Sequence, residues 1–122
     1  KESMPDEKRE YDKRFYYPTA RNNTTGVVGV YRTYKRNRDG SLTLYYAATV
    51  AVKKGKARTR HFNIEKYGEV DAFLSACSFR LMGLKAVHGD RVDKKEFRKP
   101  VKRYLRRIEQ NDLPLLVDDD ET

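Results

Sequence analysis

The sequence predicts an α+β domain: a three-stranded antiparallel sheet packed against one amphipathic helix, with an additional basic C-terminal helix. Three observations support this fold class. β-Rich segments separated by turn residues come first, an apolar stripe of helical period follows them, and a second such stripe with interleaved basic residues follows Asp90. With 122 residues, 37% of them charged, the chain has room for one domain with a small core.

Four regions follow from composition. We expect a basic and aromatic N-terminal arm over residues 1–21, the sheet-plus-helix domain over 22–89, a basic helical extension over 90–111 and an acidic tail over 112–122. Because the chain begins at a lysine, we expect it to be a piece of a longer polypeptide.

Three segments have the β-branched and aromatic composition of strands. The first is expected over residues 27–34, and residues 37–40, ending in Asp-Gly, predict a hairpin turn after it. The second and longest covers 42–53, and the turn 54–56 separates it from a third strand over 58–64.

The helix that covers the sheet is expected to start at Glu69. Gly68 serves as its cap, Glu69 and Asp71 suit the positive end of the helix dipole, and Gly83 or Gly89 marks its end. Its apolar stripe consists of Val70, Phe73, Leu74, Cys77, Leu81 and Leu84.

The C-terminal helix is expected to start near Lys99, since Pro100 fits the first turn of a helix and would disrupt its middle. Its apolar side carries Phe97, Val101, Tyr104, Leu105 and Ile108, and its basic side Lys99, Lys102, Arg103, Arg106 and Arg107. The basic side either contacts phosphates or is an ordinary solvated face.

Positive charge is concentrated in the sheet region. Between residues 26 and 67 there are ten Lys and Arg but two acids, which makes this region +8 in a chain of net charge +9. A small core cannot bury such charge, and it attracts polyanions. No apolar run approaches 18 residues, so we expect a soluble intracellular protein, nuclear in a eukaryote and otherwise cytoplasmic or nucleoid-associated.

Strand alternation separates the two faces of the predicted sheet. The helix-facing set is Val28, Val30, Tyr46, Ala48, Val50, Val52 and Phe62; the opposite set is Tyr31, Thr33, Lys35, Thr43, Tyr45, Ala47, Thr49, Ala51, Lys53, Thr59 and His61. A single helix leaves this second face open, and the small Ala47 and Ala51 permit close approach of a broad ligand. The face is either a DNA-reading surface or simply the solvated side of a small sheet.

The expected contacts to double-stranded DNA divide into two sets. Base contacts are assigned to Tyr31, Thr33, Lys35, Tyr45, Thr49, Thr59 and His61. Backbone contacts are assigned to Arg32, Arg36, Arg38, Lys53, Lys56, Arg58, Arg60, Lys102, Arg103 and Arg106. Strict alternation puts Arg58 and Arg60 on the helix-facing side, so either they reach around the sheet edge or a bulge shifts the third strand.

Three motifs in order resemble the Apetala-two/ethylene-response-factor type DNA-binding domain, and its apicomplexan transcription-factor branch most closely. They are Gly-Val-Val-Gly-Val-Tyr-Arg over 26–32, Tyr-Tyr-Ala-Ala over 45–48, and Phe-Asn-Ile-Glu-Lys-Tyr-Gly-Glu over 62–69 leading into Ala72-Phe73. The resemblance covers about residues 22–84. It implies transcriptional regulation, with the open sheet face in the major groove.

By position, the resemblance implies contacts at Tyr31, Thr33, Lys35, Thr49, Ala51, Thr59 and His61. The plant pattern has arginine and tryptophan at several of these positions, so base specificity does not transfer.

The other function classes have less support in the sequence. His61 and His88 lack any metal-ligand spacing, and Cys77 lies in the apolar stripe, so we expect no enzyme activity, metal, cofactor, membrane or small-molecule substrate. Three alternatives stay open: an RNA or single-stranded nucleic-acid binder, the DNA-targeting domain of a larger endonuclease or integrase, and a basic protein-interaction module. Whether the chain acts as a monomer or as a DNA-assisted dimer is also left open.

Overall fold

The computed structural model describes residues 25–53 and 56–113, apart from the side chains of residues 52 and 53. The predicted N-terminal arm and most of the predicted acidic tail lie outside these ranges. The elements, in chain order, are β1 (Val30–Arg36), β2 (Leu42–Lys53), β3 (Lys56–Asn63), α2 (Ile64–Tyr67), α3 (Glu69–His88), a 3-10 turn (Gly89–Arg91) and α4 (Lys94–Glu109).

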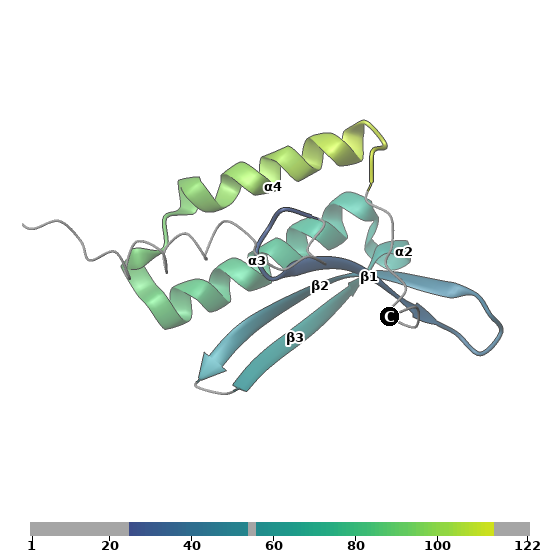
Figure 1. Ribbon diagram of the computed structural model, residues 1–122, viewed down its shortest axis with the longest axis horizontal. Helices are drawn as coiled ribbons and strands as arrows, with labels where there is room; N and C mark the ends of the chain where they lie inside the picture. Colours follow the sequence, from purple (N-terminus) through teal and green to yellow (C-terminus); the bar gives the residue numbers. More distant parts are fainter. Residues whose placement is uncertain (1–24, 54–55, 114–122) are drawn as a thin grey trace, which may run out of the picture.

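The predicted α+β fold class is confirmed. The three strands form one antiparallel sheet in the order β1-β2-β3, so β1 and β3 are its edges. Both α3 and α4 lie on one side of this sheet (Figure 1). The other side of the sheet is not covered by any of the elements described.

The first hairpin closes where the turn signal predicts it. The backbone N–H of Asn37 donates to the Ser41 carbonyl (2.8 Å), and its side-chain amide donates to the Thr43 hydroxyl (2.9 Å). Gly40 has a φ of 90°, which most other residues adopt only with strain. The Asp39 carboxylate accepts hydrogen bonds from the Ser41 side chain and backbone, and these lower the pKa of Asp39.

The strand predictions were right for β2 and shifted for its neighbours. Residues 25–29 form a turn rather than the start of β1, because the Thr25 hydroxyl donates to the Val30 carbonyl (2.7 Å) and accepts from the Val27 N–H (3.1 Å). Val28 therefore lies in this turn and not in a strand. β3 begins at Lys56, and the irregularity in its pairing falls between residues 51 and 53 of β2.

Residues 64–67 form a short helix, whereas Ile64 was predicted to end a strand. The Asn63 side chain accepts a hydrogen bond from the Lys66 N–H (3.1 Å) and so caps α2. The N–H of Gly68 then donates to the Ile64 carbonyl (2.7 Å), which closes α2, and α3 begins at the next residue. The predicted cap at Gly68 is confirmed.

Of the two ends considered for α3, Gly89 is the correct one and Gly83 lies inside the helix, but part of the predicted apolar face is wrong. Phe73, Cys77 and Leu84 are buried, whereas Val70 and Leu74 are 40% and 37% exposed. In place of those two, the helix turns small residues toward the sheet: Ala72, Ala76 and Gly83. Small side chains let the helix axis approach β2 closely, and this rotates the larger apolar residues outward.

The start predicted for α4 near Lys99 is wrong by more than a turn. Asp93 caps the helix by accepting the Lys95 N–H (2.9 Å), and Pro100 lies inside the helix. A proline there removes one backbone hydrogen bond and costs about 3 kcal/mol in an isolated helix. Pro100 is buried beside the buried Phe97 and Val101, and this packing offsets the cost.

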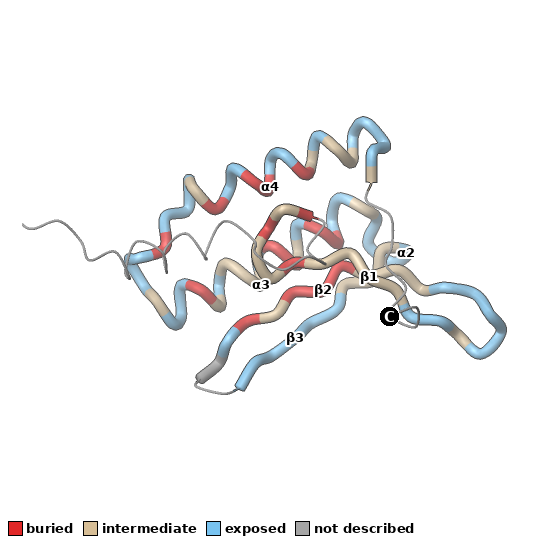
Figure 2. The backbone as a smooth tube through the Cα atoms, viewed as in Figure 1, coloured by how far each residue is buried: buried red, intermediate tan, exposed pale blue. Residues whose placement is uncertain are grey.

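The core lies between the sheet and the two long helices (Figure 2). Its five largest fully buried side chains come from the turn before β1, from β1, β2, α3 and α4: Val27, Val30, Tyr46, Phe73 and Tyr104. Phe73 is at its centre, since its ring lies 5.4 Å from the ring of Tyr46 and 4.5 Å from that of Tyr104. Both aromatic contacts join elements distant in sequence.

Candidate nucleic-acid interface

The strand register places the predicted base-contacting residues side by side on the uncovered face of the sheet, which we call the open face. Tyr31 pairs with Ala47 and Ala47 with His61, so these three form one row across the sheet. A second row joins Thr33 to Tyr45. Residues of one row have the same orientation in a pleated sheet, so all of these side chains lie on the open face.

Further along the strands, the same face carries Thr49 beside Thr59 and Lys35 beside Thr43. The hydroxyl oxygens of Thr49 and Thr59 are 2.9 Å apart and hydrogen-bonded. All seven predicted base-contacting residues therefore belong to one surface.

Aromatic side chains border Ala47, the small residue at the centre of this face. The rings of Tyr45 and His61 meet edge to face with 5.6 Å between their centres. Ala47 lies between Tyr31 and His61 in its row and is 6% exposed. Ala47 therefore does not provide the close approach expected of a small residue, and the exposed part of this face comes from the larger side chains around it.

Asn63 also has the orientation of the open face, since it pairs with Tyr45. The sequence prediction missed it, although the period of two that gave Thr59 and His61 extends to it. Its side chain already accepts the Lys66 N–H at the start of α2. Asn63 therefore joins the sheet surface to the helical layer.

The open face carries no acid within the described strands. Lys35 is a cation of this face; Lys53 has the same orientation in sequence, but its side chain lies outside the described part. Nothing on this face would therefore repel a polyanion.

Arg32, predicted to contact the DNA backbone, belongs instead to the helix-facing side. Its Nε donates to Glu69 Oε2 (2.9 Å) and its Nη2 to Oε1 (3.3 Å), and its side chain is 10% exposed. Burial disfavours the charged form, but the hydrogen bond and charge of Glu69 outweigh it, so the pKa of Arg32 is raised. The structure thus assigns Arg32 to a partly buried ion pair and not to a phosphate contact.

Glu69 anchors a larger polar cluster beneath the sheet that the sequence did not indicate. Its carboxylate also accepts a hydrogen bond from the Tyr46 hydroxyl, whose oxygen lies 2.7 Å from the Tyr104 hydroxyl. Burial first, and then these hydrogen bonds, raise the pKa of Tyr46. Burial likewise raises the pKa of Tyr104. The cluster connects β1, β2, α3 and α4 through residues up to 72 positions apart.

The other predicted phosphate-contacting residues are distributed around the sheet. Arg36 is exposed at the hairpin end of β1 and Arg38 in the turn beyond it, and Lys56 begins β3. Arg58 and Arg60 are exposed on the helix-facing side of edge strand β3, opposite Val50 and Ala48. A bulge does not explain their parity, since the irregularity in pairing lies beyond them in β2. Phosphate contact around the sheet edge stays a prediction.

The basic residues of α4 lie on the helical side of the molecule. Lys102, Arg103 and Arg106 are exposed there, while Lys99 pairs with Glu96 (2.7 Å) and Arg107 with Asp112 (3.6 Å). Because α4 is on the opposite side of the sheet from the open face (Figure 1), it does not extend that face. Phosphate contact by α4 stays a prediction.

Two negative findings concern other site types. Within the described ranges, no three His, Cys, Asp or Glu side chains come together as metal ligands, and no helix is long and apolar enough to cross a membrane. Cys77 is buried, and burial raises its pKa, so the thiol stays protonated.

Comparisons of the chain with protein-family models, with curated proteins and with solved structures found no match.

Proposed function

We propose that this chain is a sequence-specific double-stranded DNA-binding domain that inserts its open face into the major groove. We further propose that it is the DNA-binding part of a transcription factor of the Apetala-two/ethylene-response-factor type, located in the nucleus if its source is a eukaryote. The observation that carries the proposal is the register. It collects Tyr31, Thr33, Lys35, Tyr45, Thr49, Thr59 and His61 on one uncovered surface without an acid among them.

The size of the open face suits the groove. Strands in a sheet lie about 4.8 Å apart, so three strands span roughly 10 Å, and the major groove of B-DNA is about 12 Å wide. Ala47 at the centre of the face is only 6% exposed, so base edges would meet the larger side chains around it rather than the alanine itself.

The chemistry of the face also suits base recognition. Lys35 can donate to the O6 and N7 acceptors of guanine, and the threonines and His61 can make single hydrogen bonds. The threonine methyl groups can contact the methyl group of thymine. Arg36, Arg38 and Lys56 surround this face and are suited to contact phosphates, which fixes the position of the protein but not its base preference.

Selection from a random duplex library tests this proposal, because it reports binding and the preferred motif together. We expect Lys35→Ala, Thr59→Ala and His61→Ala to change the selected motif without lowering the melting temperature. Each good base contact contributes about 1 to 3 kcal/mol of discrimination. Lys95→Ala, an exposed cation on α4, is the matched control and should leave the motif unchanged. Three motifs identical to that of the original chain would refute base reading by this face.

A second candidate function rests on the rings of the open face. Tyr31, Tyr45 and His61 lie in adjoining rows, and aromatic rings on a basic sheet can stack on unpaired bases. Competition among duplex DNA, single-stranded DNA and RNA at one salt concentration separates the two. A preference for single strands would replace the duplex proposal, and no binding to any of the three would favour a basic protein-interaction module.

A further inference from the structure

The side of α3 that faces β3 carries exposed apolar surface. Among the residues described, six large apolar side chains are exposed, and four of them line two adjoining hollows between α3 and the β3 edge. They are Tyr67, Leu74, Met82 and Val87, with exposures of 47%, 37%, 69% and 50%. Gathered apolar side chains of this kind mark interaction surfaces more often than scattered ones do.

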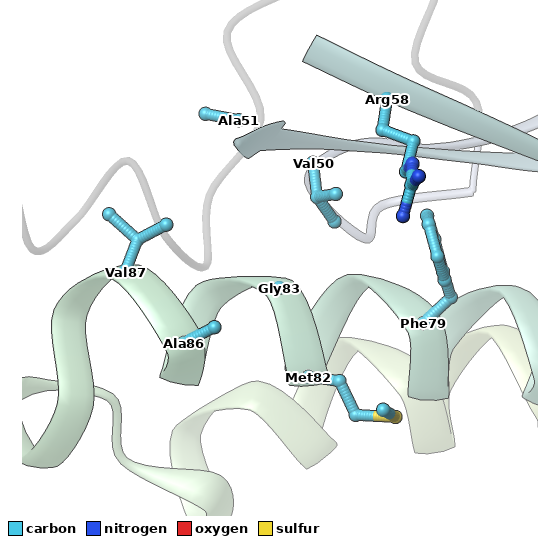
Figure 3. A pocket seen from close by; sticks show the side chains of 8 residues that line it. All are labelled: Val50, Ala51, Arg58, Phe79, Met82, Gly83, Ala86 and Val87. Atoms are coloured by element: carbon cyan, nitrogen blue, oxygen red, sulfur yellow. The ribbon is translucent and has the colours of Figure 1, made fainter. Parts of the chain in front are cut away.

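The two hollows form one groove. Their volumes are about 290 and 610 Å³, and Phe79 and Met82 line both. Figure 3 shows the smaller of the two. The groove follows α3 from Asp71 to Val87, a distance of about 25 Å at 1.5 Å per helical residue. A helix of four to five turns has this length. The helix α4, which packs against another side of α3, is of similar length with 16 residues.

The strand side of the groove is positively charged. Arg58 and Arg60 line it, and the Arg58 side chain points from β3 toward Phe79 (Figure 3). Asp71 is the one acid among the lining residues, and it lies in the first turn of α3, at one end. The groove thus has an apolar floor with a cationic rim along the strand.

This charge pattern selects among occupants. Pairing β3 with the β3 of a second copy would bring Arg58 and Arg60 near their own counterparts, and like charges opposite each other are destabilising. A nucleic-acid backbone would meet the two arginines but not the apolar floor. An acidic amphipathic helix satisfies both parts of the groove.

We propose that this groove binds an amphipathic helix of another protein, with its apolar face on Met82 and Leu74 and with acidic residues toward Arg58 and Arg60. The proposal does not depend on DNA binding, because the groove lies on the helical side of the sheet and the open face on the other. Both surfaces can be occupied at the same time.

The test uses the full chain and a synthetic 16-residue probe helix with leucine at helical spacing, glutamate elsewhere and a fluorescent label. A second probe carries lysine in place of every glutamate. We expect the glutamate probe to bind, the lysine probe to bind at least about tenfold more weakly, and Arg58→Glu with Arg60→Glu to reverse this preference. The matched control reverses two exposed charges elsewhere, Lys102→Glu with Arg106→Glu, and should keep the original preference.

The apolar contribution is tested separately. Met82→Gln should weaken binding of the glutamate probe about tenfold, whereas Leu42→Gln, at an exposed apolar residue on the first hairpin, should leave it unchanged. Both positions are exposed, so melting temperatures should stay near that of the original chain.

Four results would overturn the proposal. The first is that the glutamate probe does not bind at all. The second is an equal loss of binding in the arginine and control double variants, which would show general charge attraction. The third is self-association that Met82→Gln abolishes, which would assign the groove to a second copy. The fourth is a chain ending at Leu113 that binds the probe at least about tenfold more tightly, which would assign the groove to the acidic C-terminal tail.

Discussion

Replacing Gly83 by alanine has two opposing effects on stability: helix propensity improves, but the new methyl group conflicts sterically with Val50. A Cβ atom at position 83 would lie 2.2 Å from Cγ1 of Val50 and 2.5 Å from its Cβ. Carbon atoms in contact normally lie about 3.5 to 4.0 Å apart. A change of the Val50 rotamer moves Cγ1 but leaves its Cβ in place, so α3 itself must shift away from β2.

The magnitude follows from the two opposing terms. Alanine is favoured over glycine inside a helix by about 1 kcal/mol, and overpacking a core costs about 1 to 3 kcal/mol. Because the shift of α3 also loosens the contacts of Ala76 and Phe73, we expect the upper part of that cost. Gly83→Ala should therefore lower the free energy of unfolding by about 1 to 2 kcal/mol.

Equilibrium unfolding in urea measures this difference. Ser78 is exposed on the same helix, so the stability of Ser78→Ala relative to Ser78→Gly gives the propensity term alone. Adding Val50→Ala to Gly83→Ala removes Cγ1, the nearest atom, but keeps the Cβ atom at 2.5 Å. It should therefore relieve part of the conflict and make the two changes less destabilising together than their sum. If Gly83→Ala stabilises the chain by as much as the Ser78 pair predicts, α3 does not approach β2 closely at this point.

Three further predictions concern the core, the basic helix and the buried tyrosines. Phe73→Ala should lower the free energy of unfolding by about 3 to 5 kcal/mol, and a melting temperature like that of the original chain would show that the ring is not at the core. Changing Lys102, Arg103 and Arg106 to glutamine should reduce the slope of log affinity against log salt without altering the base motif; an unchanged slope would leave α4 a structural role. Burial raises the pKa of Tyr46 in the folded chain, so the unfolded chain ionises first as pH rises above about 10 and stability falls from there upward. In Tyr46→Phe, the free energy of unfolding in urea should decrease less as pH increases. An equally steep decrease would contradict the role of the raised Tyr46 pKa in this loss of stability.

The face assignments were predictable from the sequence because they depend on a local rule. Side chains alternate in any strand, so Tyr31, Thr33 and Lys35 had to share a side once their segment was extended. Turn chemistry is equally local: it marked the first hairpin and gave Gly89 as one of two candidate ends of α3. These features need no knowledge of what lies across the sheet.

The tertiary structure alone decided which side chains form ion pairs or are buried by packing. Arg32 looks like any basic strand residue until Glu69, 37 positions later, meets it beneath the sheet. Pro100 looks like a helix start because its cost is local, whereas the burial that offsets this cost exists only in the folded chain.

The same distinction explains the rotation of α3 and the groove beside it. Hydrophobic periodicity ranks a helix face by side-chain size, and it therefore favoured Val70 and Leu74 over the small residues that contact the sheet. In the fold, α3 comes close to β2 at Gly83 and Val50, so small residues face the sheet in place of large ones. This close packing lowers the free energy only when α3 and β2 are both in place. Alternation and turns were thus determined by the sequence itself, while the pairing of charges and the orientation of α3 were determined by contacts that exist only in the folded chain.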